Sequence, residues 1–339
     1  MTVATFDAAG LRSAINAAKA GIGRQTHIPA LAHVHITETA VTGTDLNVTI
    51  AASAHGAGGD GKVAVLADPT FLLAALKGAT GPVTIEGADS DATLKVGERV
   101  VNWRPIAIDD WPRLNTVADG DTVDLGDAAH VIYAAGHDQL RPILTTVAFG
   151  EGHAVATDSY RLSVVPIDYD GPVRLVPATA LAVAAKRDVT AVTFSDRGCR
   201  LDGDGIAITA RLIDGDYPNW AQLVPTTFDY GATFDRDAAR AVLDAMSWAE
   251  IVRVTLTGDV LSFRAVDADH GREQSETIPA DTTGGDLTVA FNVTFLDDAF
   301  AACGDMVQFD AVDPLKPTRI TTADVADGRL ELLMPVRLT

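Results

Sequence analysis

The sequence has little cysteine, few aromatic residues and a shortage of positive charge. Its 339 residues include 2 cysteines and 6% aromatic residues, and 26 lysines and arginines face 46 aspartates and glutamates, for a formal net charge of -20. Because Cys199 and Cys303 lie far apart in apolar contexts, we expect small core residues in a reducing compartment rather than a disulfide. The acidic surplus argues against a protein that coats nucleic acid, since phosphate binding requires cations. It leaves open a protein whose few cations gather on one surface.

Long apolar runs are also absent. No run approaches 18 apolar residues, and the first ten residues, MTVATFDAAG, have no basic segment followed by an apolar one. The sequence therefore predicts neither a membrane span nor a signal peptide, and we expect a cytoplasmic protein without a membrane partner. Hydrophobic residues still make up 47% of the chain, which is enough to bury real cores, and the length alone allows two or three domains.

An internal repeat is the most informative feature of the sequence. Three segments align without gaps: LADPTFLLAALKGATGPVTIE from Leu66, VPATALAVAAKRDVTAVTFS from Val176, and FNVTFLDDAFAACGDMVQFD from Phe291. Each predicts a short strand, a helix of small residues, a turn and a strand with alternating polarity. The polar or hydroxyl residue just before each helix is a candidate N-cap.

A second helical pattern precedes each aligned segment. It carries an aspartate, Asp7, Asp127 or Asp237, followed by two alanines, and we expect the aspartate in the first turn, where the helix dipole favours it. Short strand patterns fill the rest of the chain. We therefore expect an α+β fold of three topologically similar domains, each with two helices on mostly antiparallel sheets, at residues 1–117, 118–226 and 227–339. Three linked copies suggest curvature that closes into a ring.

Positive charge recurs on the helices of the repeat. In the first helix, Leu11, Ile15 and Ala18 can share a buried face, which leaves Arg12 and Lys19 on the opposite side. Taken singly, such cations fit an ordinary solvated face, but their recurrence predicts one face that is less acidic than the rest. The other cations at corresponding places are Arg24, Lys77, Lys186, Arg187, Arg236 and Arg240.

The stretch AVATDSYRLSVV, from Ala154 to Val165, interrupts an apolar element with a polar centre. A plain hairpin would explain Asp158 and Ser159 as turn residues, whereas the wall of a binding site would also explain Tyr160. Copies one and three have no evident equivalent of its Thr-Asp-x-x-Arg-Leu core. The stretch thus predicts a site that is built once per chain on a scaffold that repeats.

Five motifs, in order along the chain, resemble one known family. They are GRQTHIPALAHVHI (23–36), LRPILTTVAF (140–149), VATDSYRLSV (155–164), DGDYPNWAQLVP (214–225) and LLMPVRLT (332–339). Inside a triple repeat, they are similar to the bacterial replicative sliding clamp, the beta subunit of DNA polymerase III. The resemblance covers nearly the whole chain.

The resemblance implies a ring-shaped homodimer, each chain forming half of the ring, with duplex DNA in a hole lined by helices. Such a clamp has no cofactor and does no chemistry; it keeps the polymerase at high effective concentration near its template. The implied partners are sequence-independent duplex DNA, the DNA polymerase III alpha subunit and other polymerases, and the clamp loader. Weak, salt-dependent contacts from a few cations would permit sliding, and an acidic outer face would repel DNA.

The resemblance also implies sites. A groove for short linear peptides would use apolar side chains, with Thr157 and Arg161 offering hydrogen bonds. Its residues are Leu144, Thr157, Ser159, Tyr160, Arg161, Leu162, Pro218, Gln222, Leu223, Leu332, Leu333, Met334, Pro335, Val336, Arg337 and Leu338. The DNA-binding residues are Arg12, Lys19, Arg24, Gln139, Arg141, Lys186 and Arg187. The dimer contact would bring Lys77, Val101 and Trp103 near the helix at 237–246.

Some residues depart from the family pattern. Ser159 stands where a glycine is usual, Gln222 where an arginine is common, and the basic residue expected near Ala178 is missing. We therefore expect a peptide preference that differs from that of a housekeeping clamp. A divergent, accessory or phage-encoded clamp fits these departures. A clamp-like decoy that binds partners without encircling DNA is a separate alternative, which a closed dimer loaded onto circular DNA would exclude.

Enzymatic alternatives find less support. His153, Asp158 and Ser159 have the residue types of a hydrolase triad, but on a strand they cannot converge on one proton path. An acidic hydrolase could use the paired carboxylates at 109–110 or at 214 and 216, which the repeat places in turns at domain ends. His33 and His35 share a strand face without an evident third metal ligand. We therefore expect neither catalytic residues nor a bound metal.

Overall fold

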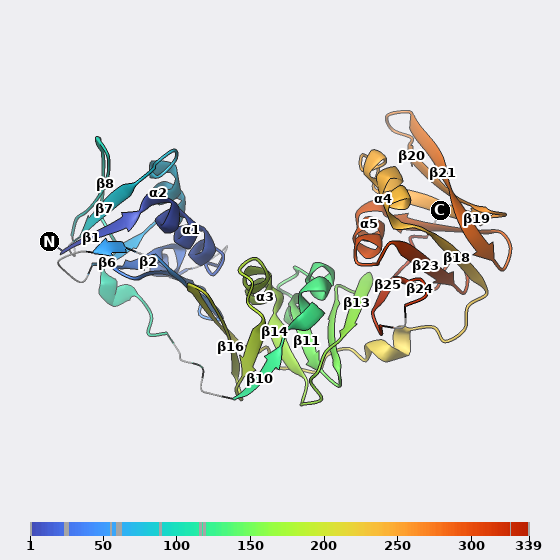
Figure 1. Cartoon of the computed structure of the whole chain (residues 1–339), viewed down its shortest axis with the longest axis horizontal. Coiled ribbons are helices and arrows are strands. Elements are labelled where there is room, and N and C mark those ends of the chain that lie inside the picture. Colours follow the sequence, from blue (N-terminus) through green and yellow to red (C-terminus); the bar gives the residue numbers. More distant parts are fainter. Residues whose placement is uncertain are drawn as a thin grey trace. The chain divides into compact units, whose positions relative to one another are not determined.

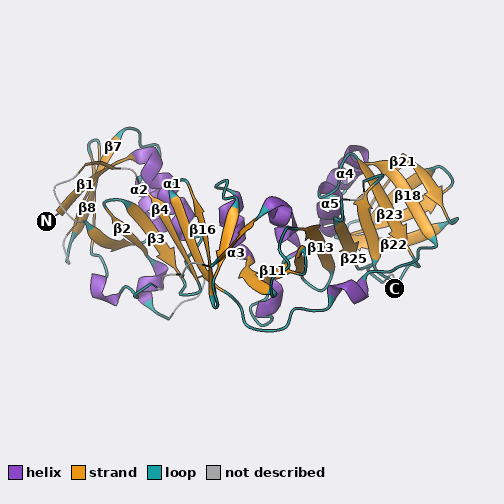
Figure 2. Cartoon of the chain, turned by 60° about the horizontal axis from the view of Figure 1, so that its bottom comes forward, coloured by secondary structure: helices purple, strands orange, loops and turns teal. Residues whose placement is uncertain are grey.

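The computed structural model describes residues 2–23, 27–54, 56–58, 63–87, 90–114, 117, 120–325 and 327–337, and the structural statements below concern these residues. They form helices and antiparallel sheets (Figure 1, Figure 2), as the α+β prediction requires. The chain divides into two compact units, Met1–Gly126 with Val176–Ile213, and Asp127–Leu175 with Asp214–Thr339. The three domains with boundaries after residues 117 and 226 stay a prediction. Within the described ranges, no helix is long and apolar enough to cross a membrane.

The first unit contains two sheets. In spatial order, the five-stranded sheet consists of β5 (Gly56–Gly58), β1 (Thr2–Asp7), β7 (Pro82–Gly87), β8 (Ala92–Val96) and β9 (Arg99–Trp103). The eight-stranded sheet consists of β10 (Asp121–Asp124), β15 (Ala191–Phe194), β16 (Gly198–Gly203), β17 (Ile206–Arg211), β4 (Val48–Ser53), β3 (Ala40–Thr44), β2 (Val34–Thr37) and β6 (Ala64–Ala67).

A twelve-stranded sheet contains the strands of the second unit. In spatial order it consists of β14 (Arg174–Pro177), β11 (Thr146–Gly150), β12 (His153–Thr157), β13 (Arg161–Pro166), β25 (Leu330–Leu333), β24 (Thr318–Thr322), β23 (Met306–Ala311), β18 (Tyr230–Asp235), β21 (Arg272–Thr283), β20 (Val260–Asp267), β19 (Ile251–Thr257) and β22 (Leu287–Asn292).

Helices pack in pairs against these sheets. Figure 1 shows α1 beside α2 in the first unit and α4 beside α5 in the second. The α-helices are α1 (Ala8–Lys19), α2 (Pro69–Ala75), α3 (Ala178–Ala185), α4 (Arg236–Ala245) and α5 (Val293–Ala301). The 3₁₀ helices are η1 (Pro29–Ala32), η2 (Ile108–Asp110), η3 (Gly126–Ala134), η4 (Pro142–Thr145) and η5 (Trp220–Leu223).

Each aligned segment folds into strand, helix and strand, which confirms the predicted order: β6–α2–β7, β14–α3–β15 and β22–α5–β23. The predicted N-caps are confirmed in two copies. The side chain of Asp68 accepts hydrogen bonds from the N–H groups of the first turn of α2, and that of Asn292 accepts one from the N–H of Phe295 in α5. In copy two the position is Pro177, whose side chain cannot cap a helix.

The preceding helices differ from the prediction in two ways. Asp7 is the N-cap of α1, one residue before the first turn, and the N-cap of α4 is Asp235 rather than the aligned Asp237. Each of these two caps is the last residue of a strand and directly follows a phenylalanine. Asp7 therefore aligns with Asp235, two residues before the position that the sequence pattern suggested. In copy two, Asp127 does lie in a first turn, but the helix is the 3₁₀ helix η3.

Two antiparallel strand pairs join successive copies of the repeat. β17 of copy two pairs with β4 of copy one, and β25 of copy three pairs with β13 of copy two. We call these pairings the first joint and the second joint. In each, the receiving strand is the second strand of a hairpin, β3–β4 or β12–β13. Because the joints cross the boundaries between copies, each compact unit contains one joint and a part of copy two.

Candidate functional site

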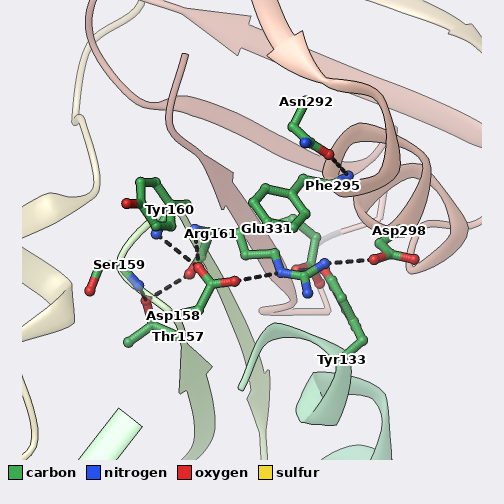
Figure 3. Close-up of polar contacts among 10 residues, drawn as sticks. All are labelled: Tyr133, Thr157, Asp158, Ser159, Tyr160, Arg161, Asn292, Phe295, Asp298 and Glu331. Atoms are coloured by element: carbon green, nitrogen blue, oxygen red, sulfur yellow. Dashed lines mark hydrogen bonds and ion pairs between the residues drawn. The ribbon is translucent and has the colours of Figure 1, made fainter. Parts of the chain in front are cut away.

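The loop between β12 and β13 is built by two side chains (Figure 3). Thr157 Oγ1 donates to the carbonyl oxygen of Arg161 at 2.6 Å and accepts from the N–H of Ser159 at 3.2 Å. Asp158 Oδ1 accepts from the N–H groups of Tyr160 at 2.8 Å and Arg161 at 3.0 Å. The prediction that this stretch contains a turn at Asp158 and Ser159 is therefore confirmed. Ser159 adopts a φ of 82°, in the region where glycine alone avoids a steric penalty.

Copy one contains the same turn, which the sequence analysis missed. Thr44 Oγ1 donates to the carbonyl oxygen of Val48 at 3.1 Å and accepts from the N–H of Leu46 at 3.0 Å. Asp45 Oδ1 accepts from the N–H groups of Asn47 and Val48, and Leu46 has a φ of 74°. The expectation that copy one has no equivalent of the Thr-Asp-x-x-Arg-Leu core is therefore wrong for its Thr-Asp turn and correct for its arginine and leucine, where copy one has Val48 and Thr49. The turn is part of the scaffold, and the distinctive change is an arginine in copy two where copy one has Val48.

Arg161 is the centre of an interaction network inside the second unit (Figure 3). Its Nε lies 3.0 Å from Asp158 Oδ2 and its Nη1 lies 2.6 Å from Asp298 Oδ2 on α5. The guanidinium lies 4.2 Å above the ring centre of Phe295 and 5.2 Å from that of Tyr133. Its side chain is 12% exposed. Arg161 thus ties the β12–β13 loop to α5 and η3, and its contact with a peptide stays a prediction.

Glu331 lies beside this network, on β25 in the second joint. It is 5% exposed, accepts a hydrogen bond from Ser163 Oγ at 2.9 Å, and accepts another from the hydroxyl of Tyr133. Burial raises the pKa of Glu331 to about 8, although these hydrogen bonds and the nearby charges of Arg161 and Arg329 oppose the shift. Burial and the adjacent Glu331 also raise the pKa of Tyr133 well above its ordinary value. Burial at this site therefore favours the protonated form of the carboxyl.

Exposed apolar side chains flank the loop. Tyr160 is 60% exposed and Met334 is 41% exposed, and the N–H of Met334 donates to the carbonyl oxygen of Tyr160 at 2.9 Å. Leu223, the last residue of η5, is 52% exposed. Exposed apolar side chains are typical of a partner-binding surface where they form one contiguous patch. The polar groups of Thr157, by contrast, are already bonded within the chain.

The carboxyl-terminal segment is held on both sides. The N–H of Met334 bonds to the β12–β13 loop, and the N–H of Val336 donates to the carbonyl oxygen of Ala290 on β22 at 2.7 Å. Pro335 and Val336 are half-buried and Arg337 is exposed. Leu338 lies outside the described residues. The segment thus lies between the loop and β22, and its role as one wall of a peptide groove stays a prediction.

The other predicted groove residues take different positions. Leu162 and Leu332 are buried with Val155 and Val164 in a small apolar cluster, against which Tyr217 and Trp220 pack. Leu333 belongs to the main core of the second unit. The predicted residues Leu144 (half-buried), Ser159, Pro218 and Gln222 (exposed) complete the set. Some of the predicted groove thus supports the surface from beneath, and the rest reaches solvent.

The predicted DNA-binding residues fall in both units. In the first unit, Arg12 Nη1 donates to the carbonyl oxygens of Leu76 and Ala79 after α2, and Lys19 Nζ donates to Thr70 Oγ1. Arg187 Nη2 donates to Ser13 on α1, and Lys186 is exposed. In the second unit, Gln139 is exposed and Arg141 bonds to Asp138 and Ser159. Arg24 lies outside the described residues. The cations on α1 and after α3 have no acidic partner within the described residues, whereas Arg141 is tied to the β12–β13 loop.

The first helix of copy three does not share this character. Arg240 pairs with Asp297 on α5 at 2.8 Å, and Arg236 pairs with Asp237 at 2.8 Å and with Asp305 at 3.5 Å. Each cation of α4 is thus matched by an acid, and α5 adds Asp298, which pairs with Arg161. The expectation of a less acidic face is already weaker in copy three because of Asp237 and Asp244, and these ion pairs weaken it further there.

Comparisons with known proteins agree with this geometry. A family model described as the DNA polymerase III beta subunit, C-terminal domain, matches residues 222–337. The beta sliding clamp of Synechococcus elongatus is 29% identical over 297 residues, which is 76% of this chain and 76% of that protein. The crystal structure of the Thermotoga maritima DNA polymerase III beta subunit is similar with a TM-score of 0.84, at 19% identity and over 100% of both chains. That of a Pseudomonas aeruginosa sliding clamp bound to griselimycin has a TM-score of 0.82, at 19% identity, over 99% of this chain and 100% of that one.

The chain thus resembles the beta sliding clamp family in sequence and in fold. Its fold is the α+β fold of DNA polymerase III beta clamps, and the similar curated proteins are named beta sliding clamps. Within the described part of the chain, no three His, Cys, Asp or Glu side chains lie where they could hold a metal ion.

Sequence reasoning missed part of this candidate site. It identified Arg161 but not its partners Asp298, Phe295 and Tyr133, nor the buried Glu331. One signal was available for Glu331, which is the only charged residue in the apolar run LELLMPV near the carboxyl end. An acid in the middle of a buried strand requires a polar partner, and that requirement points to a network.

Proposed function

We propose that two copies of this chain close head to tail into a ring that encircles duplex DNA and tethers a replicative polymerase. The ring would be loaded by a clamp loader, and both the loader and the polymerases would dock through short linear peptides. The protein itself would supply no catalytic residue. Topology rather than tight binding would keep it on DNA, because a ring needs only weak contacts to slide.

The repeated joint is the observation that carries this proposal. Within one chain, β17 pairs with β4 and β25 pairs with β13. In both joints, the last strand of one copy pairs with the second hairpin strand of the copy before it. Among the described strands, one last strand and one second hairpin strand have no such partner within the chain. One is β9, the last strand of copy one, at the end of its sheet; the other is residues 272–279 of β21, which pair with β20 on one side. If β9 of one chain paired with β21 of another, the pairing would repeat the joint between chains. Two copies joined in this way at both ends would form a closed ring.

Helix contacts at the joints support the same arrangement. In the first joint, Arg187 after α3 contacts Ser13 of α1, and in the second, Arg161 links Tyr133 of η3 to Asp298 of α5. Each joint therefore places the first helix of one copy near the second helix of the next. Between two chains, the rule would place α4 near α2, which agrees with the expected dimer contact at Lys77, Val101 and Trp103.

The DNA and peptide surfaces have different chemistry. Cations on α1 and after α3 suit weak phosphate contacts, whereas the ion pairs of α4 leave little charge for DNA. Tyr160, Met334 and Leu223 offer an exposed apolar surface for a peptide, with Arg337 available to an acidic residue. We therefore expect the first unit to contribute more to DNA retention and the second unit to carry partner recognition.

Sedimentation equilibrium and retention on DNA test the proposal together. The wild-type protein should be a dimer, should be retained on nicked circular DNA after loading, and should be released when the circle is cut. The variant Lys19→Glu/Lys186→Glu should be loaded less well and still bind a polymerase peptide, whereas the exposed control Lys316→Glu should behave as wild type. A monomer that binds the peptide would exclude the ring and favour the accessory or decoy function.

A further inference from the structure

Strand β19 carries an arginine that has no acidic partner. Val252 and Val254 are buried in the core together with residues of α4 and α5, so Arg253, which lies between them, points to the opposite face of the sheet. Arg253 is half-buried, and within the described residues it has no hydrogen-bond or ion-pair partner. We call this side of β22, β19 and β20 the outer face. The guanidinium of Arg253 thus keeps its N–H donors for a group from outside the chain.

The arginine directly opposite, Arg264 on β20, is in a different state. It shares the outer face with Arg253 and pairs with Glu273 at 2.8 Å. Other arginines of copy three that pair with acids are Arg236, Arg240, Arg319 and Arg329. Like charges directly across a strand pair repel, so Arg253 lowers the stability of the sheet and gains no partner in return among the described side chains. Proteins keep such local conflicts mainly at functional sites.

The carboxyl-terminal segment connects Arg253 to the candidate peptide surface. The N–H of Met334 donates to the carbonyl oxygen of Tyr160, and the N–H of Val336 donates to that of Ala290 on β22. Ala290 is directly opposite Arg253, so the two share the outer face. Ala290 is nevertheless only 1% exposed, so other atoms cover it where the segment is bonded. Arg253 therefore lies two strand spacings, about 10 Å, from the segment.

We infer that Arg253 binds an aspartate or glutamate of a partner protein, a few residues beyond the apolar part of the peptide that docks at Tyr160 and Met334. Arg253 would extend the surface of the proposed function, on which this inference rests. An extended peptide advances about 3.3 Å per residue, so three residues cover the distance from the carboxyl-terminal segment to Arg253. The guanidinium can then donate two parallel N–H bonds to one carboxylate.

The charge of the whole protein makes the preference for an acid informative. A formal net charge of -20 opposes the approach of an acidic peptide, so tighter binding of an acid than of an amide requires a local cation. The exposed Arg337 is another arginine beside the candidate peptide surface. Because Arg337 directly follows Val336, it would meet acids close to the apolar part of a peptide, whereas Arg253 would meet acids about three residues away. Varying the two arginines one at a time therefore separates their contributions.

Fluorescence titration with matched forms of one labelled polymerase peptide tests this assignment. One form carries three aspartates next to its apolar residues and the other carries three asparagines; one pair of forms has this extension at the amino end and a second pair has it at the carboxyl end. At low ionic strength, the wild type should bind the aspartate form of one pair about fivefold more tightly than the asparagine form. Added salt should weaken this preference.

The variant Arg253→Gln should lose the preference for aspartate. Two controls should keep it: Arg264→Gln/Glu273→Gln, which removes the neighbouring ion pair of the outer face, and Lys316→Gln, which removes one exposed positive charge elsewhere. A preference that survives in Arg253→Gln overturns the inference, whether or not Arg337→Gln removes it.

The asparagine forms separate this inference from the proposed function. They should bind Arg253→Gln as tightly as they bind the wild type, because the apolar contacts are unchanged. If the wild type binds the asparagine forms and shows no preference for aspartate, Arg253 is not an acid-binding residue and the peptide surface stands. If none of the forms binds the wild type, the peptide surface itself is wrong, and the role of Arg253 with it.

Two further measurements exclude other roles for Arg253. In urea denaturation, the free energy of unfolding of Arg253→Gln should stay the same or rise, because the variant loses repulsion from Arg264 and no internal bond. A loss of stability together with weaker binding of every peptide form would mean that Arg253 supports the sheet and does not contact a partner. Retention on nicked circular DNA should also be unchanged. A loss of retention with an intact preference for aspartate would assign Arg253 to DNA phosphates and overturn the inference.

Discussion

The two joints inside the chain have the same backbone pairing and different centres. In the first, Ile50 and Ile208 are fully buried against each other; in the second, the same position holds Ser163 and the buried Glu331. The two hairpins that receive the joints even share the Thr-Asp turn. The shared backbone pairing thus defines the scaffold of both joints. The side chains at the centre of a joint can differ without changing that pairing.

The polar centre lies where the candidate peptide surface is built. Arg161 holds the loop at 158–160 against α5 through Asp298, and Glu331 is three residues before Met334, which bonds to that loop. In copy one, Val48 stands in place of the arginine, and the strand that pairs with the hairpin is β17 rather than the carboxyl-terminal β25. A fully satisfied polar network fixes one arrangement of its members more strictly than apolar contacts do. We therefore interpret the second joint as the support of the recognition surface.

The largest effect should follow from removing the arginine at the second joint. Arg161→Ala leaves Asp158 and Asp298 without their cation, and should lower the free energy of unfolding by about 3 kcal/mol. It should also abolish binding of a labelled polymerase peptide, because the loop loses its tie to α5. Urea denaturation and a fluorescence titration measure the two effects, with Arg141→Ala, whose cation pairs at the surface, as the stability control. Unchanged peptide affinity in a folded Arg161→Ala protein would show that peptide binding does not depend on the interaction network of Arg161.

Truncation at the first joint should be nearly as costly for stability and should leave recognition intact. Ile208→Ala removes a fully buried side chain that faces Ile50, and should cost about 2 to 4 kcal/mol of unfolding free energy. Peptide affinity should stay as in wild type, because the second unit is unaffected. The exposed edge residue Val100, truncated to alanine, should change stability by less than about 0.5 kcal/mol. A loss of peptide binding in Ile208→Ala would contradict the division of roles between the joints.

The second joint should also make stability depend on pH, with a sign that is unusual for a glutamate. The pKa of Glu331 is raised to about 8 in the folded protein, so the folded state keeps a proton that the unfolded state releases above about pH 4.3. The stabilisation is complete below that value. It falls by about 1.4 kcal/mol per pH unit as pH rises, until it is lost above pH 8.

Glu331→Gln isolates this contribution, because glutamine keeps the neutral form at every pH. Urea melts at pH 6, 7 and 8 should show the wild type losing stability relative to the variant as pH rises. Parallel pH profiles for the two proteins would mean that Glu331 is ionised in the fold. Ile208, at the corresponding position of the first joint, has no titratable group. We therefore expect this pH dependence of stability to arise from the second joint alone.

Local sequence patterns predicted the helices and strands of the scaffold. The features that they did not predict depend on contacts between residues that are far apart in the sequence. The helices, the strand order and the caps at Asp68 and Asn292 follow from residues within a few positions of one another. Tyr133 and Glu331 are 198 residues apart in sequence, and the pairing that brings them together exists only once β25 joins β13. The same reason hid the ion pair of Arg240 with Asp297, which cancels a charge that seemed free in the sequence. The alternation of a strand shows that one of its faces is buried, but it does not show which distant strand supplies the partner.

The smallest effect should come from the turns that the two hairpins share. Leu46 and Ser159 occupy the same position in them, at φ values of 74° and 82°. Because a left-handed conformation costs a non-glycine residue about 1 to 2 kcal/mol and glycine loses more entropy on folding, Leu46→Gly and Ser159→Gly should each stabilise by about 0.5 to 1 kcal/mol. Ser247→Gly, at an exposed serine outside the left-handed region, should destabilise instead. Only Ser159→Gly should alter peptide affinity, since Ser159 lies next to Tyr160 and bonds to Arg141. Equal changes of peptide affinity in both glycine variants would mean that the turn, and not its place beside the second joint, governs recognition.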